Sequence, residues 1–224
     1  MRLLSLLLCF LLLSSISFSQ DAKGYYINLQ GDTLRGQIAL PIKKDAIRFD
    51  KMTFDVKFTQ DGQKPKKIDR LSAKGFGFVY DGRNYEFVTW DVKASKQIYL
   101  PSPLGDVAPN GVYFILKTED GSWPLYSLFQ MVEDKRSVLN DPSKNSPSAY
   151  RQEFNGYKVK REIIFKHPTK GFQLLSGKYP LLMRFSETLK YLEMEEDFIK
   201  TLQKKQKNLL EIVKEYNSWK VLQG

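Results

Sequence analysis

The chain has very little of the residue types that carry most enzyme chemistry. It contains one cysteine and one histidine in 224 residues. Disulfide frameworks and histidine- or cysteine-based zinc sites need more of these residues. Cysteine–histidine catalysis needs one of each, and it is excluded if the cysteine is removed with the N-terminal stretch that contains it. The sequence also contains no P-loop, no G-x-G-x-x-G dinucleotide loop and no G-x-S-x-G nucleophile elbow. We therefore predict no catalytic, cofactor-binding or metal-binding residue and do not expect an enzyme.

The single cysteine, Cys9, lies in an N-terminal stretch that we interpret as a secretory signal. Arg2 precedes the apolar run Leu3–Leu13, and the small residues Ser17 and Ser19 follow it. This order is typical of a cleaved signal peptide, whereas a membrane-spanning helix needs about 20 apolar residues. We predict a signal peptide over residues 1–19 and export to the periplasm, the outer membrane or the medium. An uncleaved anchor is the alternative.

The charge balance is basic. Lysine and arginine number 35 against 25 acidic residues, and removing residues 1–19 takes away only Arg2, so the net charge falls from +10 to +9. A basic protein attracts anionic lipids, polyanionic glycans or nucleic acids, although the charge also serves solubility. Because no RNA-recognition or OB-like motif is present, we expect an envelope protein or an anionic glycan or lipid surface as partner, and not nucleic acid.

Short apolar runs separated by Gly/Asp turns fill the chain up to Leu175. The first pair surrounds Gly31-Asp32 in Tyr25–Leu40, and Pro41 is expected to end it. Asp81-Gly82 is the strongest hairpin signal. The pattern predicts an antiparallel β domain over residues 20–180, with a surface loop near 132–149. Further predicted strands are Thr53–Thr59, Lys74–Tyr80, Asn84–Thr89, Lys96–Leu100, Gly111–Thr118, Trp123–Phe129, Lys158–Lys166 and Phe172–Leu175.

Two glycine positions carry local predictions. Gly36 stands where an apolar residue is expected, which suggests a bulge or a bend. The second position is the pair Gly75 and Gly77, which alternate with large aromatic residues, so that a ring or another backbone can pack closely there. In the strand at Lys158–Lys166, the alternation places Val159, Ile163 and Phe165 inward.

The period changes to that of helices over residues 181–224. We expect Ser186 to cap the first helix and the polar stretch Gln203–Asn208 to break the region. An apolar stripe should dock on the sheet, with a partner or membrane helix as the alternative. Its residues are Leu189, Leu192, Phe198, Ile199, Leu202, Leu209, Leu210, Val213 and Tyr216.

The ionisable residues of the C-terminal third receive structural interpretations. His167 precedes Pro168 in a predicted turn, where a lone histidine is expected to be exposed to solvent. Glu196 and Lys200 have the spacing of a helical ion pair. The acidic cluster of Glu193, Glu195, Glu196 and Asp197 suits a helix start. A carboxylate-dependent hydrolase acting on glycans would need two carboxylates across a cleft.

Three stretches resemble uncharacterised secreted proteins of Bacteroidetes-type bacteria. GYYINLQGDTLRGQ at Gly24–Gln37 is similar to their Gly-Tyr-Ile…Gly-Asp-Thr…Gly opening. Ile68–Phe78 leads into a similar G-F-x-F strand, and LLEIVKEYN at Leu209–Asn217 resembles their closing Tyr-Asn helix. The resemblance implies an exported protein and brings no catalytic residues with it.

These observations predict an α+β, mainly β protein. Antiparallel hairpins form a curved sheet or a partly closed barrel, and C-terminal helices follow and pack on or beside it. The predicted role is that of a basic, secreted or periplasmic module of the cell envelope. It would bind a protein partner or an anionic surface without catalysis; the alternative is the glycan hydrolase.

Overall fold

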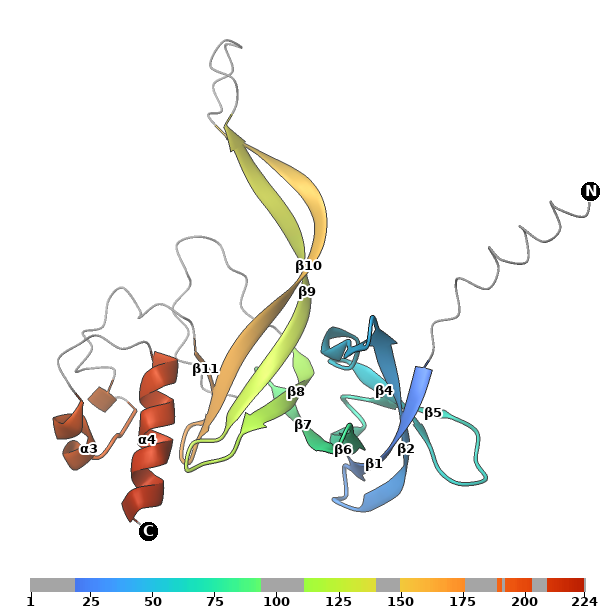
Figure 1. The fold of residues 1–224 in the computed structure, drawn as a ribbon, viewed down its shortest axis with the longest axis horizontal. Coiled ribbons are helices and arrows are strands. Elements are labelled where there is room, and N and C mark those ends of the chain that lie inside the picture. The colour runs from blue at the N-terminus through green and yellow to red at the C-terminus, as the bar shows by residue number, and fades with distance from the viewer. Residues whose placement is uncertain are drawn as a thin grey trace, which may run out of the picture. The chain divides into compact units, whose positions relative to one another are not determined.

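A computed structural model describes residues 19–93, 111–139, 150–175, 189–190, 192–202 and 209–223 (Figure 1). For residues 19, 134–139, 150–155 and 175 only the backbone is described. The strands form one antiparallel sheet in the order β11-β10-β9-β8-β7-β6-β1-β2-β4-β5, with β3 paired to β2, and the sheet is not closed. The prediction of a mainly β, antiparallel protein that ends in helices is therefore confirmed.

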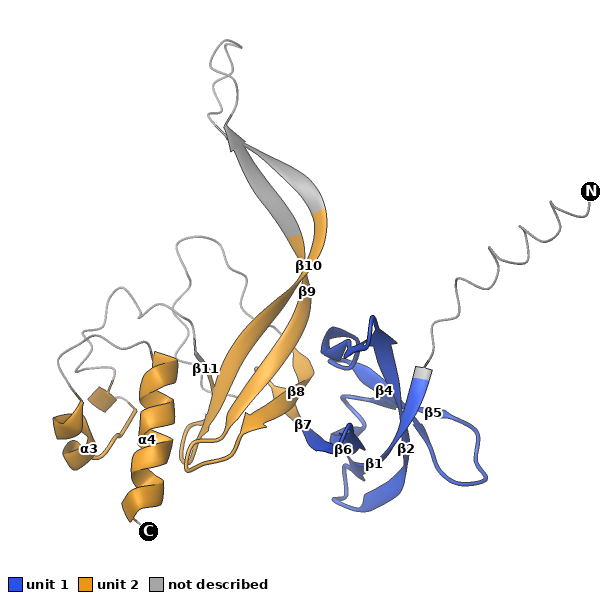
Figure 2. Cartoon of the chain, in the orientation of Figure 1, with its two compact units in different colours: residues 1–86 blue, residues 87–224 orange. Residues whose placement is uncertain are grey.

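The chain divides into two compact units, residues 1–86 and 87–224 (Figure 2). The elements described up to the boundary are β1 (Ser19–Asn28), β2 (Thr33–Lys43), β3 (Ala46–Ile47), the 3-10 turn η1 (Phe49–Lys51), β4 (Asp55–Thr59), β5 (Lys66–Asp69) and β6 (Ala73–Tyr80). Those that follow are β7 (Arg83–Asp91), which crosses the boundary, β8 (Val112–Glu119), β9 (Leu125–Leu139), β10 (Tyr150–His167), β11 (Gly171–Leu175), α3 (Glu196–Thr201) and α4 (Leu209–Gln223).

The turn of the first hairpin is held by backbone hydrogen bonds of Asn28 to Gly31 and Asp32 and by the side chain of Asn28. Asn28 Oδ1 accepts hydrogen bonds from the backbone N–H groups of Gly31 and Asp32 at 2.9 and 2.8 Å. Asn28 Nδ2 donates to Asp32 Oδ2 at 2.9 Å. Gly31 has a φ of 101°, which is a conformation that favours glycine. Gly31-Asp32 therefore reverses the chain, as predicted.

The return strand shows neither the predicted end at Pro41 nor a bulge at Gly36. β2 does not end at Pro41, because Pro41 pairs with Ser19 at the end of the β1–β2 ladder and Ile42 and Lys43 go on to pair with β3. Gly36 causes no bulge, since the β1–β2 register passes through Gly24↔Gly36 without a shift. The glycine instead admits the ring of Phe58, whose Cζ would lie 2.6 Å from an added Cβ.

Residues 1–86 have their own buried side chains. The alternation of β4 buries Val56 and Phe58, and that of β6 buries Phe76 and Phe78. The predicted close approach at Gly77 is confirmed, because the ring of Tyr25 lies where a Cβ would stand. The other buried apolar residues of this unit are Ala22, Tyr26, Ile38, Leu40, Met52, Ile68 and Ala73.

The stretch Val132–Leu139 was predicted to belong to a surface loop, and this prediction is wrong. It continues β9, which pairs with β10 from Phe165↔Leu125 out to Tyr150↔Leu139, with one register shift between Phe154 and Tyr157. Backbone hydrogen bonds between two strands do not require apolar side chains, so the polar composition did not reveal the strand. Figure 1 shows β9 and β10 running on together beyond the ends of β8 and β11.

The C-terminal helices dock on the β9–β10 hairpin. Near its base, one face of the hairpin carries Leu125 and Phe165, and these pack with Trp123. Phe198 of α3 and Tyr216 of α4 belong to the same cluster. The residues of the C-terminal segment that complete it are Leu189, Leu192, Met194, Ile212 and Val213, with Ile199, Leu202, Leu209 and Leu210 partly buried against it. The apolar stripe therefore covers the sheet, as predicted.

The opposite face of the hairpin base is buried as well. Ile164 packs there with Tyr126, Leu128 and Trp90, while its neighbour Phe165 points to the helices. This explains why two consecutive residues of β10 are buried. Val159, which was predicted to point inward, is 46% exposed, because it lies farther along the hairpin than the helices reach.

Several predictions concern residues outside those described: the signal peptide up to residue 18, the strand Lys96–Leu100, the capping residue Ser186 and the helix break at Gln203–Asn208. Among the described residues, no helix has the length and apolar character that crossing a membrane requires.

Candidate functional site

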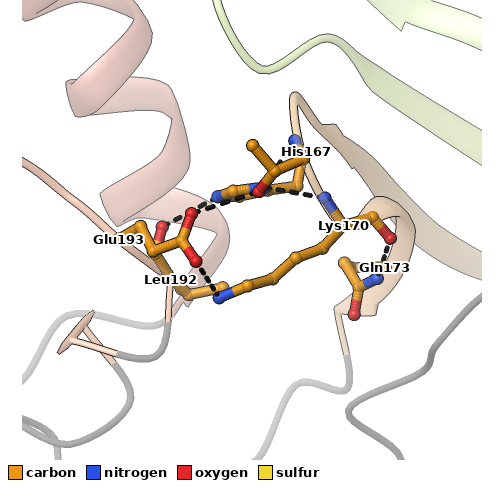
Figure 3. Close-up of polar contacts among 6 residues, drawn as sticks. His167, Lys170, Gln173, Leu192 and Glu193 are labelled. Atoms are coloured by element: carbon orange, nitrogen blue, oxygen red, sulfur yellow. Dashed lines mark hydrogen bonds and ion pairs between the residues drawn. The ribbon is translucent and has the colours of Figure 1, made fainter.

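The lone histidine lies in a cluster of polar contacts that joins the β10–β11 turn to Leu192 and Glu193 (Figure 3). His167 ends β10, and its side chain is only 3% exposed, so the prediction of a solvent-exposed histidine is wrong. Its ring lies 4.8 Å from that of Trp123, centroid to centroid. The C-terminal segment covers this turn, and no feature of the sequence near His167 predicts that it would be covered.

Both ring nitrogens of His167 are engaged. Nε2 lies 2.9 Å from the carbonyl oxygen of Leu192. The backbone N–H groups of Thr169 and Lys170 both donate to Nδ1, each at 3.2 Å. Because a carbonyl only accepts and a backbone N–H only donates, these bonds assign the proton to Nε2 of a neutral ring. The histidine thus ties the β10–β11 turn to the segment that precedes α3.

A second link joins the same turn to Glu193. The Thr169 hydroxyl donates to Glu193 Oε2 at 3.1 Å, and Lys170 Nζ lies 3.2 Å from Oε1. Lys170 and then Thr169 lower the pKa of the Glu193 carboxyl through these bonds. Glu193 itself has a φ of 52°, an uncommon conformation for a residue other than glycine.

The His167 cluster resembles a catalytic arrangement only in its residue types. Thr169 Oγ1 lies 3.1 Å from Nδ1 of the ring, a distance at which a histidine can activate a hydroxyl. However, the lone pair of Nδ1 already accepts two backbone N–H groups, and the hydroxyl proton is directed to Glu193. The ring has no lone pair left for a substrate proton or a metal ion, so the cluster holds the chain together.

The acidic cluster also serves the attachment of the helices. Glu195 Oε1 accepts from Lys220 at 2.6 Å, and its Oε2 accepts from the Tyr216 hydroxyl at 3.3 Å. Lys200 pairs with Asp197 at 2.9 Å, in place of the predicted partner Glu196. Within the part of the chain that is described, no group of three or more His, Cys, Asp or Glu side chains could hold a metal ion.

Sequence reasoning did not identify Asn217 as an important residue. Its side chain is buried in α4 and bonds both backbone groups of Trp123: Oδ1 accepts from the N–H at 2.8 Å, and Nδ2 donates to the carbonyl at 2.9 Å. Gly121 leaves room for it, since a Cβ there would lie 2.6 Å from Asn217 Cγ. A polar residue that directly follows Tyr216 on an apolar helix face was the available signal.

One surface combines exposed apolar side chains with charge. We call it the ribbon face. It is the side of the β9–β10 hairpin on which the paired residues Phe129 and Arg161, Met131 and Val159, and Glu133 and Tyr157 lie. Met131, Tyr157 and Val159 are 45%, 64% and 46% exposed. The opposite side of the same stretch carries Lys158 and Lys160.

Comparison of the chain with family models, with curated proteins and with solved structures gave no match.

Proposed function

We propose that the protein is an exported module of the cell envelope that binds a protein partner or an anionic surface without catalysing a reaction. The observation that carries this proposal is the ribbon face. Single exposed apolar residues are common on proteins, but here three lie together on one hairpin. Lysine side chains on the other side of the hairpin and the net charge of +10 favour acidic partners.

The use of the ionisable residues supports binding over catalysis. His167, Glu193 and Glu195 make bonds that join separate segments of the chain, and Asp197 pairs with Lys200 within α3. Among these residues, no pair of carboxylates faces a place where a glycan could bind between them. No observation therefore favours the glycan hydrolase. The signal-like N-terminus and the resemblance to secreted proteins support an exported location.

A salt titration with lipid vesicles tests the anionic-surface part of the proposal. The purified protein should sediment with vesicles that contain anionic lipid at about 20 mM salt and dissociate as salt approaches about 500 mM, because exposed charges are then screened over a few ångströms. Neutral vesicles are the control. Failure to bind anionic vesicles at low salt would exclude this part and leave a protein partner.

A further inference from the structure

We infer that the ribbon face is a docking surface for a second copy of this chain, a step that rests on the proposed binding function. The face continues a surface that the protein already covers. Leu125 and Phe165, on the same side of the hairpin, lie under the helices, whereas Met131, Val159 and Tyr157 lie beyond them. The same side of one hairpin is thus buried at its base and exposed farther along.

A two-stranded hairpin needs packing to be stable in water. Beyond the pairings of β8 with Leu125–Ser127 and of β11 with Ile163–His167, β9 and β10 continue as a ribbon of two strands (Figure 1). The exposed apolar side chains of the ribbon face are therefore positioned where a partner would add both apolar burial and support for the strands.

The charges on the ribbon face indicate which partner fits. Arg161 stands at one end of the apolar strip and Glu133 at the other, four residue pairs away along the register. Arg161 is held on this face, because its Nε donates to Ser127 Oγ at 2.9 Å and its guanidinium lies 5.9 Å from the centre of the Phe129 ring. A purely acidic surface would suit Arg161 and repel Glu133.

A second copy is complementary in charge to both ends of the strip. When two ribbons pack face to face about a two-fold axis perpendicular to the strands, Met131 and Val159 meet their own equivalents. Arg161 of each copy then faces the pair that holds Tyr157 and Glu133 of the other, and Tyr157 offers it a ring as well as a nearby carboxylate. The surface is self-complementary in apolar contacts and in charge.

Charge reversal tests the inference. The purified protein should sediment as a dimer at about 100 µM, and Arg161→Glu or Glu133→Arg alone should weaken the dimer at least about tenfold, because each places like charges together at both ends. The double variant Arg161→Glu/Glu133→Arg should recover the dimer to within about threefold of the unmodified protein. Lys158→Glu, on the opposite side of the ribbon, should leave the dimer unchanged.

Thermal melts accompany each measurement, because Arg161→Glu also loses the bond to Ser127. The double variant carries the same loss, so its recovery separates docking from folding. A protein that stays monomeric at about 100 µM overturns the inference. A dimer whose affinity is unchanged in both single variants also overturns it, as does a folded double variant that fails to recover the dimer. Binding of a monomer to anionic vesicles would leave the proposed function standing while this inference fails.

Discussion

At the scale of single residues, the protein uses buried polar side chains as ties between distant stretches of chain. Asn217 binds both backbone groups of a residue 94 positions away. His167 binds the backbone of its own turn through one nitrogen and that of Leu192 through the other. Each of these side chains both donates and accepts, a combination that no carboxylate or lysine offers at neutral pH.

Asn217→Ala should destabilise the protein strongly. The substitution leaves the N–H and the carbonyl of Trp123 without partners in a buried place, which costs about 2–5 kcal/mol for the two groups. Urea unfolding monitored by tryptophan fluorescence measures the loss. Ser218→Ala, at the adjacent exposed residue, should change the free energy of unfolding by less than about 0.5 kcal/mol. Equal effects of the two substitutions would show that the bonds to Trp123 contribute little.

Tyr216 should make the protein sensitive to alkali. Burial, followed by the charge of Glu195 and the hydrogen bond to it, raises the pKa of Tyr216 to about 12. An unfolded tyrosine loses its proton near pH 10, so between about pH 10 and 12 the folded state binds more protons, and stability falls as pH rises. The loss approaches about 3 kcal/mol, at about 1.4 kcal/mol for each pKa unit.

The variant Tyr216→Phe isolates this contribution. Other tyrosines and the lysines titrate in both proteins, so they cancel in the difference between the two free energies of unfolding. That difference, measured by urea unfolding at pH 8 and at pH 11.5, should shrink or reverse at the higher pH. A difference that is the same at both pH values would contradict the burial of an un-ionised Tyr216 hydroxyl.

At the scale of the elements, features set by neighbouring residues could be predicted from the sequence. Asp81 and Gly82 both have positive φ, 50° and 68°, which is the type I′ geometry that an Asp-Gly pair predicts between strands. The alternation of residues in β6 correctly predicted the burial of Phe76 and Phe78 and the close ring contact at Gly77. In each case, the preference of a few adjacent residues and the burial that the fold provides agree.

Features decided by a distant partner could not be predicted. β9 extends to Leu139 because β10 pairs with it, and β2 continues past Pro41 because β3 pairs with Ile42 and Lys43. Val159 alternates like a core residue but lies beyond the reach of the helices. The burial of His167 depends on Leu192, which lies 25 residues later. Sequence periodicity reports a local tendency, and the covering element decides the outcome.

At the scale of the whole molecule, each compact unit has buried side chains of its own. Residues 1–86 bury an aromatic and aliphatic set around Phe58 and Phe76, and residues 87–224 bury two clusters around Trp90 and Trp123. All three tryptophans of the chain, the third being Trp219, belong to residues 87–224. Tryptophan fluorescence therefore reports on that unit alone, while far-ultraviolet circular dichroism reports on both.

Gly36→Ala should make the unfolding transitions of the two units occur at different urea concentrations. The added Cβ would lie 2.3 Å from the carbonyl oxygen of Thr59 and 2.6 Å from Cζ of Phe58, so β4 must move, at a cost of about 1–3 kcal/mol. Because the strain falls on a core that contains no tryptophan, we expect the dichroism-detected transition of residues 1–86 to shift to lower urea while the fluorescence midpoint stays in place. The control is Arg35→Ala, at the exposed neighbour on β2, which should shift neither the dichroism nor the fluorescence midpoint.

Asn217→Ala should have the opposite effect to Gly36→Ala, because it should lower the fluorescence midpoint. A common shift of both signals by Gly36→Ala would mean that the two units unfold as one cooperative body.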